Sequence, residues 1–222
     1  MSRIVLKCGG AVAAAAAEPA LALASDGHQV CVVHGAGPQI SAELRRRGLE
    51  VAFVRGRRVT SEAALEVVRA SLASVNEALC AEIGPRALAL FGDEIGLRAS
   101  RVAGLGEVGD PVPSRPPELE AALTAGRIPV IAPLAEGPLN VNADEAAAAL
   151  AIGLGADRLL FATDVDGVFL EGRYLCAIGA DSADLLLATG TFEGGIVPKL
   201  VAAVRAARSG VRSEIGVTAV LA

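Results

Sequence analysis

The sequence predicts an α/β fold, in which helices cover both faces of a mainly parallel β-sheet. Short runs of β-branched and other apolar residues, such as residues 29–33, alternate along the chain with longer segments of helical periodicity. Several of these apolar runs end in glycine turns, and ligands of such folds bind at the carboxyl ends of the strands. The 222 residues suffice for one large domain or two closely joined lobes.

In the first part of the chain, each element is predicted from its local hydrophobic pattern and from the residues that begin or end it. An Ala-rich segment predicts a helix at residues 11–25, Gly48 ends a helix at residues 38–47, and Ser61 begins a long amphipathic helix. A further helix is expected at residues 118–125. Residues 92–117 are rich in glycine, proline and charge, with a hairpin expected around residues 101–109. The predicted strands are residues 4–6, 29–33, 51–54, 87–91 and 128–132.

The second part of the chain continues the alternation. An Ala-rich helix follows residues 139–144 and ends near Gly153. A strand at residues 159–163, a turn and a short strand at residues 168–170 come next, then a helix at residues 182–189. A loop is expected at residues 190–198 and a helix from Lys199 to about Arg208. Two short strands, residues 211–215 and 217–221, complete the prediction.

Composition excludes several classes of function. A net charge of −5 and an aromatic content of 3% argue against nucleic acid or an anionic membrane as the partner. No apolar run reaches membrane-spanning length without glycine or charge. The dispersed Cys8, Cys31, Cys80 and Cys176 indicate reduced, buried thiols in a cytoplasmic protein. With two histidines in the chain, a His-based metal site is not expected.

The glycine turns and the lysines beside them favour phosphate chemistry. Lys7 precedes one glycine pair, and Gly194 and Gly195 precede Lys199. Two lysines and several open N–H groups suit a polyphosphate, whose charge is spread over several oxygens. Phosphoryl transfer needs mainly alignment and charge neutralisation, and a carboxylate acceptor needs no general base. On its own, the turn at residues 35–37 fits a tight structural turn as well as an anion site, and it lacks P-loop spacing.

Five motifs, in this order, resemble the amino-acid kinase family and within it the N-acetylglutamate kinases. They are Lys-Cys-Gly-Gly at residues 7–10, His-Gly-Ala-Gly-Pro-Gln at 34–39, Gly-Arg-Arg-Val-Thr at 56–60, Asn-Val-Asn-Ala-Asp at 140–144 and Gly-Gly-Ile-Val-Pro-Lys at 194–199. The resemblance covers nearly the whole chain. It implies a three-layer α/β/α sandwich of carbamate kinase-like fold. Residues 1–138 would form an N-lobe for the acyl amino acid, and residues 139–222 a shortened C-lobe for ATP, on one continuous sheet.

The resemblance also implies roles for the reacting centre. Lys7 and Lys199 would stabilise the transferring phosphoryl group from opposite sides, and Asp144 would hold the two lysines in place. Thr163 and Asp164 would lie where the C-lobe meets the nucleotide. Mg²⁺ would be carried by the ATP phosphates, with no protein metal site.

For the acyl amino acid, the resemblance implies that Arg58 grips the α-carboxylate, while Asn140 and Asn142 orient the amide and the α-substituents. Backbone donors to the phosphate and to the reacting carboxylate would come from four positions in the two glycine turns: Gly9, Gly10, Gly35 and Ala36.

Simpler interpretations stand beside these roles. Asn140 and Asn142 also suit a turn and a helix N-cap, and Asn142 can serve both purposes. Arg58 lies in a basic cluster that could be a solvated face, and dipole complementarity alone explains an acid at Asp144. We expect His34 to be a hydrogen-bonding residue at the end of a strand and not a catalyst.

The chain departs from the family pattern at several points. Ala36 replaces a glycine, which would cost about 1 kcal/mol if that position needed a positive φ. Arg55 and Arg57 stand where a small polar and an apolar residue are usual. Residues 215–218 pass directly into the last strand, which puts the adenine end of the site in question. The first strand begins at Arg3, without the extra helix of the arginine-inhibited hexamers, so we expect a homodimer without arginine feedback.

The function implied is ATP-dependent phosphorylation of the γ-carboxylate of N-acetyl-L-glutamate, a step of arginine synthesis. Two alternatives remain open at this point. One is a sister kinase for another acidic substrate, such as a carrier-linked aminoadipate, although Arg58 with Asn140 and Asn142 favours a small free substrate. The other is a non-catalytic binding module, which the shortened C-lobe favours and the intact lysines oppose.

Overall fold

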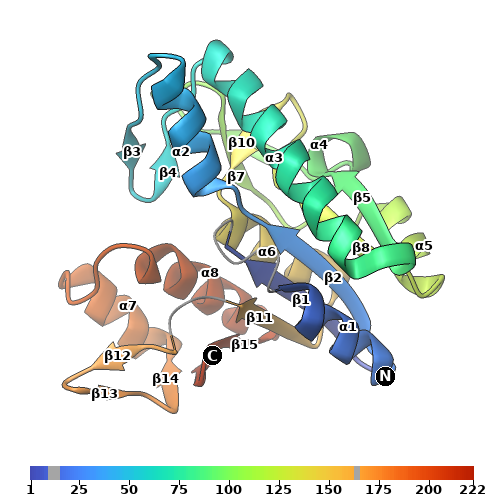
Figure 1. Cartoon of the computed structure of the whole chain (residues 1–222). Helices are drawn as coiled ribbons and strands as arrows, with labels where there is room; N and C mark the ends of the chain where they lie inside the picture. The colour runs from blue at the N-terminus through green and yellow to red at the C-terminus, as the bar shows by residue number, and fades with distance from the viewer. Residues whose placement is uncertain (10–15, 163–165) are drawn as a thin grey trace.

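The computed structural model describes residues 1–9, 16–162 and 166–222, and it is built around one eight-stranded sheet (Figure 1). The strand order is β14-β16-β15-β11-β1-β2-β8-β5, and neighbouring strands are parallel except for the antiparallel pair β15 and β16. The strands are β1 (Arg3–Cys8), β2 (Gln29–His34), β5 (Ala87–Phe91), β8 (Ile128–Ala132), β11 (Arg158–Ala162), β14 (Ala177–Gly179), β15 (Arg212–Ile215) and β16 (Thr218–Leu221).

Strand β1 lies in the middle of the sheet and sets the position of the site. It pairs with β2 on one side and β11 on the other, so that Lys7 lies beside Val33 and Phe161. Five of its six residues are buried, and Lys7 is the buried charge in an otherwise apolar run. Cys8 pairs with His34, so β1 and β2 end at the same edge of the sheet.

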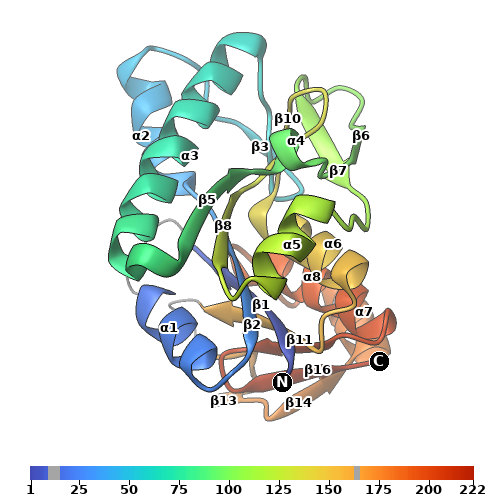
Figure 2. The same ribbon diagram turned by 90° about the vertical axis from the view of Figure 1, so that its right-hand side faces the viewer.

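Helices cover both faces of this sheet, which confirms the predicted three-layer α/β/α architecture (Figure 2). On one face, α1 (Ala17–Ser25) and α3 (Glu62–Ile83) pack on β2, β5 and β8, and α2 (Gly37–Arg46) packs on α3. On the other face, α5 (Pro117–Thr124), α6 (Ala143–Leu154) and α8 (Ile196–Arg208) pack on the sheet, with α7 (Ala180–Ala188) against α8. The cores are built from Leu, Val, Ile and Ala, as the low aromatic content requires.

Smaller strands surround the carboxyl edge. A four-stranded sheet has the order β6-β7-β10-β9, from β6 (Ala99–Arg101), β7 (Val108–Pro111), β9 (Leu134–Ala135) and β10 (Leu139–Val141). The antiparallel pair β6 and β7 confirms the expected hairpin. Two further hairpins are β3 (Phe53–Val54) with β4 (Arg57–Arg58), and β12 (Phe169–Leu170) with β13 (Arg173–Tyr174). A short α4 (Gly92–Ile95) follows β5, and a 3₁₀ turn, Gly84–Arg86, follows α3.

Three expectations need correction or restriction. Helix α8 begins at Ile196 and not at Lys199, because a proline in the first turn removes only an N–H that has no helical partner. Cys8 and Cys31 are buried as expected, but Cys176 is exposed and Cys80 only partly buried. Residues 11–15 of the expected first helix lie outside the described residues.

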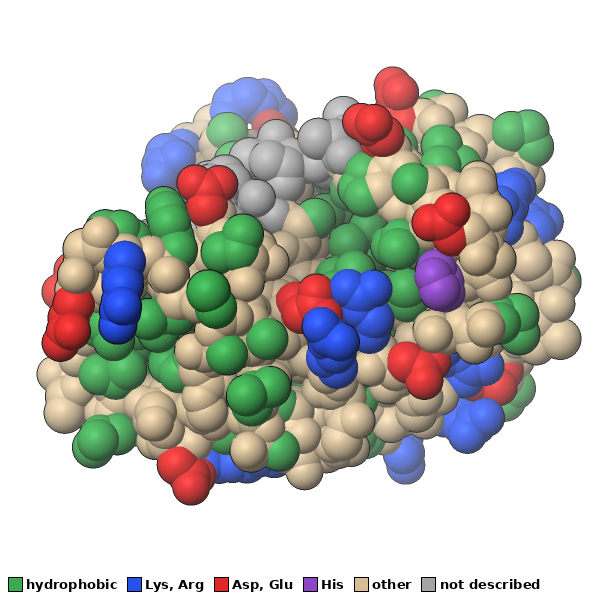
Figure 3. All heavy atoms as spheres, turned by 90° about the horizontal axis from the view of Figure 1, so that it is seen from below, with side chains coloured by type: hydrophobic (Ala, Val, Ile, Leu, Met, Phe, Trp, Pro, Cys, Tyr) green, Lys and Arg blue, Asp and Glu red, His purple; other side chains and the backbone are tan. Residues whose placement is uncertain are grey.

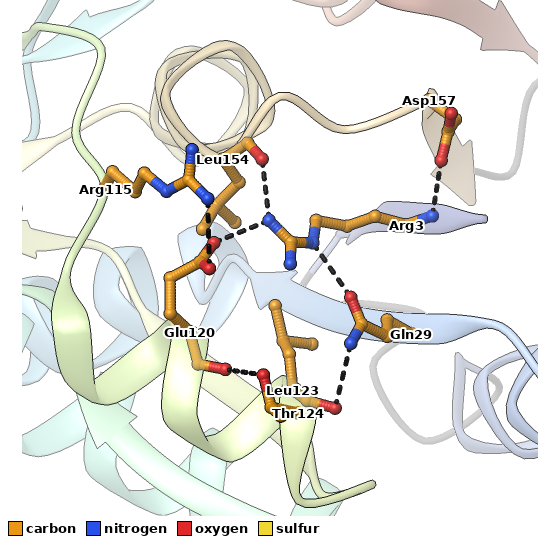
Figure 4. Close-up of polar contacts among 8 residues, drawn as sticks. All are labelled: Arg3, Gln29, Arg115, Glu120, Leu123, Thr124, Leu154 and Asp157. Atoms are coloured by element: carbon orange, nitrogen blue, oxygen red, sulfur yellow. Dashed lines mark hydrogen bonds and ion pairs between the residues drawn. The ribbon is translucent and has the colours of Figure 1, made fainter. Parts of the chain in front are cut away.

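The amino end of the sheet is tied together by Arg3, whose polar contacts are drawn in Figure 4. Its Nη1 donates to Glu120 Oε1 at 2.5 Å and to the Leu154 carbonyl at 2.7 Å, and its Nε donates to Gln29 Oε1 at 3.0 Å. The Arg3 amide donates to Asp157 Oδ2 at 2.6 Å. Since these partners belong to β2, α5, α6 and the segment before β11, Arg3 joins the layers at the edge opposite the site.

The surface gives no continuous basic area on the face drawn in Figure 3, where basic and acidic side chains are interspersed. Within the described ranges, no helix is both long enough and apolar enough to cross a bilayer.

Candidate functional site

A cavity of about 470 Å³ opens at the carboxyl ends of β1 and β2. All predicted site residues that the structure describes line it, and they come from both ends of the chain: Lys7, Gly9, Gly35, Ala36, Arg58, Asn140, Asn142, Asp144 and Lys199. Gly10, Thr163 and Asp164, predicted to contact the nucleotide, lie outside the described residues. The fold therefore gathers five motifs that are far apart in the sequence around one opening.

The centre of the cavity is a carboxylate shared by two lysines. Lys7 Nζ lies 2.8 Å from Asp144 Oδ1, and Lys199 Nζ lies 4.0 Å from Asp144 Oδ2. Lys7 and Asp144 are 4% and 5% exposed, so this ion pair is almost fully withdrawn from water. The Lys199 ammonium also donates to the Gly195 carbonyl at 3.2 Å. The chain contains no lysine besides these two, and its other basic side chains of fixed charge are arginines.

Asp144 is oriented by the start of α6. Asn142 is the N-cap of this helix, and its Oδ1 accepts hydrogen bonds from the amides of Asp144 at 2.8 Å and Glu145 at 3.2 Å. The N-terminal end of a helix also favours an acidic side chain. The predicted N-cap is confirmed. Because the Nδ2 of the same side chain donates to the Gly56 carbonyl at 3.2 Å, Asn142 also ties the β3–β4 hairpin to α6.

Two helix N-termini add positive potential around the cavity. Helix α2 follows Ala36, and α8 follows Gly195, and both residues line the opening. The amides of Ala36 and Gly37 donate to no partner among the described residues, so they remain open to an anion. Ala36 has φ −141° and ψ 29°, so alanine replaces glycine here without a positive φ and without the strain considered above.

One predicted donor is already used. The Gly35 amide donates to the Cys8 carbonyl at 2.9 Å, which continues the pairing of β1 and β2 by one residue. The prediction that this amide serves a phosphate or carboxylate is therefore wrong for the described structure. Gly35 still lines the cavity, where a residue without a side chain leaves space for a ligand.

Arg58 is a buried cation with a free donor. Its Nη2 donates to the Gly37 carbonyl at 3.1 Å and to Ser41 Oγ at 2.8 Å, and its guanidinium lies 4.5 Å from the centre of the Phe53 ring. Its Nη1 is buried without a partner, and in the described part of the chain no carboxylate forms an ion pair with it. Burial, followed by the charge of Arg45, lowers the pKa of Arg58. An anionic ligand group at Nη1 would satisfy the missing contact.

Asn140 is held beside the same hairpin. Its Nδ2 donates to Thr60 Oγ1 at 2.9 Å, and the Thr60 hydroxyl donates to the Arg58 carbonyl at 2.8 Å. The chain of hydrogen bonds links β10 to the backbone that presents Arg58. It leaves the side-chain carbonyl of Asn140 as an acceptor at the cavity wall.

His34 is confirmed as a hydrogen-bonding residue at a strand end. It is fully buried, and its Nε2 lies 3.1 Å from Asn76 Nδ2 of α3, which also donates to the Val130 carbonyl at 2.9 Å. Burial lowers the pKa of His34 to about 4, so the ring is neutral at physiological pH. The partner Asn76 was not predicted, because a single polar residue in a long amphipathic helix gives no sign of what it meets.

The cavity has further walls that sequence reasoning missed. Phe53, Gly56 and Arg57 of the β3–β4 hairpin line it, as does Pro198 of α8. A Cβ at Gly56 would lie 3.6 Å from Pro198 Cβ, so the hairpin tip contacts the start of α8. The positive φ angles of Arg55 (49°) and Gly56 (78°) form this tight tip. The sequence signal for the hairpin was the Arg-Gly pair between a short apolar run and a short basic run.

The described residues contain no group of three or more His, Cys, Asp and Glu side chains that could hold a metal ion. The donor set of the cavity is instead cationic, with two lysines, one arginine and helix N-termini. Such a set fits the oxygens of phosphate and carboxylate groups.

Comparison with known proteins agrees with this geometry. The sequence pattern of the amino acid kinase family matches residues 2–216. An acetylglutamate kinase from Rubrobacter xylanophilus is 42% identical over 224 aligned positions, which cover 97% of this chain and 88% of that protein. The solved structure of smu.665 from Streptococcus mutans UA159 superposes with a TM-score of 0.90 at 28% identity, over 99% of this chain and 98% of that one.

A more distant structure shows the same architecture. Carbamate kinase from Giardia lamblia bound to AMP-PNP superposes with a TM-score of 0.76 over 99% of this chain and 98% of that one. At 16% identity, this likeness concerns the fold alone. It confirms the predicted carbamate kinase-like fold. The chain belongs to the amino acid kinase family, and the relative that it matches at 42% identity is an acetylglutamate kinase.

Proposed function

We propose that this protein transfers the γ-phosphoryl group of ATP to the γ-carboxylate of N-acetyl-L-glutamate, giving N-acetyl-γ-glutamyl phosphate and ADP. The observation that carries the proposal is the pair of ammonium groups, Lys7 and Lys199, on the two oxygens of Asp144. The acetylglutamate kinase relative supports the choice of acceptor.

In this reaction the protein forms no covalent bond with the substrates and mainly positions them. A γ-carboxylate oxygen attacks the γ-phosphorus, the bond from that phosphorus to the bridging oxygen of ADP breaks, and the electron pair stays on ADP. The acceptor is ionised at neutral pH, so no general base is required. Lys7 and Lys199 neutralise charge on the moving group, and Asp144 holds both ammonium groups beside its two oxygens. The open amides of Ala36 and Gly37 add donors at the helix N-terminus.

The acyl amino acid binds under the β3–β4 hairpin. In this arrangement Arg58 donates its unpartnered Nη1 to the α-carboxylate, while Asn140 and Asn142 orient the amide and the α-substituents. The ring of Phe53 lies against the guanidinium and limits its freedom. A cavity of about 470 Å³ suits a small free substrate, which does not favour a carrier-linked acceptor.

ATP would meet Lys7, Gly9 and Lys199 at its phosphates, and Gly10, Thr163 and Asp164 complete the predicted contacts. Mg²⁺, when bound, supplies further charge neutralisation, and the phosphate oxygens would carry it. This assigns the acyl amino acid to a lobe of residues 1–138 and ATP to residues 139–222. We also propose a cytoplasmic homodimer working in arginine synthesis.

The test is ATP-dependent formation of a hydroxamate, in which hydroxylamine traps the acyl phosphate. N-acetylglutamate, glutamate and aminoadipate are compared in parallel at equal concentration. The proposal expects product with N-acetylglutamate, and at least tenfold less with the other two. Product only with another acid would establish a sister kinase, and ATP binding without any product would establish a binding module. Either result would overturn the proposal.

A further inference from the structure

Four charged side chains form a continuous chain beside the cavity. Arg57 Nε donates to Glu145 Oε2 at 3.0 Å, and Arg57 Nη2 lies 2.9 Å from Asp110 Oδ1. Arg205 Nη1 lies 3.7 Å from the same Asp110 oxygen. The charges alternate in sign along the chain, so each contact is attractive.

Three of the four residues come from elements that carry predicted site residues, and the fourth, Asp110, lies on β7. Arg57 precedes Arg58 on β4, Glu145 follows Asp144 in the first turn of α6, and Arg205 lies on α8 after Lys199. The chain of ion pairs therefore connects the hairpin that carries Arg58 with α6, which carries Asp144, and with α8, which carries Lys199.

The hairpin has little else to hold it. Its strands are two residues long, and Phe53 and Val54 on β3 are 55% and 45% exposed. A two-stranded hairpin of this length does not keep its position by itself. Besides the contacts of Arg58 and the approach of Gly56 to Pro198, the polar contacts of Arg57 and Asn142 are what attach it to α6.

The surroundings of Arg57 exclude it as a second anchor for the substrate. Its side chain is 20% exposed, and its donors are turned to Glu145 and Asp110. Glu145 is 14% exposed, and burial raises the pKa of its carboxyl against the opposing effect of Arg57. Arg57 thus serves acidic groups of the protein, whereas Arg58 has a buried donor without a partner.

We propose that Arg57 is a positioning residue, whose ion pairs with Glu145 and Asp110 hold the β3–β4 hairpin so that Arg58 faces the groups on α6 and α8. This inference rests on the proposed function for its effect on substrate, and it makes the affinity for the acyl amino acid depend on a residue whose donors serve Glu145 and Asp110. Loss of Arg57 frees the hairpin. It also removes the Arg57 partner of Glu145 and leaves Asp110 with Arg205 alone, beside a cavity for an anion.

The kinetic test is a double-mutant cycle. Arg57→Met is expected to raise the KM for N-acetylglutamate about tenfold, with kcat and the KM for ATP within about twofold of the wild type. Glu145→Gln, which leaves Arg57 in place, is expected to raise the same KM several-fold. The double variant is expected to have the same KM as Arg57→Met. The contact between Arg57 and Glu145 is already broken in the single variant, so removing the second partner adds no further loss. Arg57→Lys is expected to recover part of the affinity.

The matched control is Arg158→Met. Arg158 Nη2 donates to Glu214 Oε2 at 2.9 Å across β11 and β15, at a comparable exposure of 34% and 19%, and neither residue lines the cavity. This variant is expected to leave the KM for N-acetylglutamate unchanged. A KM that rises as much as in Arg57→Met would make the effect a general loss of stability and would overturn the inference.

A second readout does not need catalysis. Amide hydrogen exchange of residues 53–58 in the protein without ligand is expected to be at least fivefold faster in Arg57→Met, and unchanged in Arg158→Met. If neither the exchange nor the KM changes, the inference is wrong. If Glu145→Gln has no effect while Arg57→Met does, Arg57 acts on the substrate directly and the inference is also wrong. Should the wild type make no acyl phosphate, the proposed function fails, and hydrogen exchange still decides whether Arg57 holds the hairpin.

Discussion

Replacing Asp144 by asparagine removes the carboxylate charge shared by the buried ammonium group of Lys7 and the partly exposed one of Lys199. Asp144 Oδ1 lies 2.8 Å from Lys7 Nζ, and both side chains are less than a tenth exposed. The substitution keeps the size of the side chain and its place after the Asn142 cap. The substitution therefore removes only the negative charge. The ammonium group of Lys7 is affected most, because it is buried and water cannot replace the carboxylate as its partner.

The size of the effect follows from this burial. Removing one partner of a buried ion pair costs about 3–5 kcal/mol, since the other charge is left uncompensated. For a chain of this length, each kcal/mol lowers the melting temperature by about 2–4 °C, so Asp144→Asn should melt roughly 6–20 °C below the wild type. The two lysines, no longer held together, should also lower kcat on the order of 100-fold.

Differential scanning calorimetry without nucleotide measures the first effect. The double variant Lys7→Met/Asp144→Leu is the control, because an apolar pair of similar volume replaces a buried ion pair at little cost. It should melt within about 5 °C of the wild type and be inactive. A melting temperature of Asp144→Asn equal to that of the wild type would refute the reasoning that this pair is a buried, mutually dependent contact.

Three other predictions concern single groups. Arg58→Leu should raise the KM for N-acetylglutamate at least 100-fold and leave the KM for ATP within about twofold, because only the buried guanidinium at the hairpin is lost; equal changes in both constants in steady-state assays would argue against this placement. His34, with its pKa lowered to about 4 from 6.5, is neutral in the folded protein while the unfolded chain binds a proton, so stability should fall as pH drops below 6.5. Between pH 7.5 and pH 5 the free energy of unfolding, measured with urea, should fall by about 2 kcal/mol, and His34→Gln should remove this pH dependence. Burial raises the pKa of Cys8 and Cys31 to about 12, so maleimide should label the exposed Cys176 within minutes and spare these two; mass spectrometry that finds Cys8 labelled in the folded protein would contradict their burial.

The central strands could be predicted from the sequence because both faces of them are buried. Such strands form continuous apolar runs, and a lysine within one, at position 7, had to have a particular partner. Asn142 and the acidic residues after it likewise fit the start of a helix by local chemistry alone. The grouping of these elements around one cavity followed from the rule that the carboxyl ends of parallel strands meet.

Other features depend on distant contacts and could not be predicted. Strands β9, β13 and β14 have two or three residues, so the neighbours with which they pair decide whether they form. The Gly35 amide was expected to be free, but the carbonyl of Cys8 on the neighbouring strand already accepts its hydrogen bond. The partners of Arg57 lie far along the chain, and nothing near Arg57 distinguishes it from the adjacent arginines before the chain is folded.

In the proposed reaction, Lys7 and Lys199, both held by Asp144, act together on the transferring phosphoryl group. The most direct test of this joint action is the rate of a single turnover in Lys199→Met. With wild-type enzyme in excess over ATP and saturating N-acetylglutamate, rapid quenching measures the phosphoryl-transfer step itself. The variant should transfer phosphate at least 100-fold more slowly, while calorimetry finds its Kd for N-acetylglutamate within about threefold of the wild type. An unchanged rate of transfer would show that the second ammonium group has no part in the reaction, and the account of the site would be wrong.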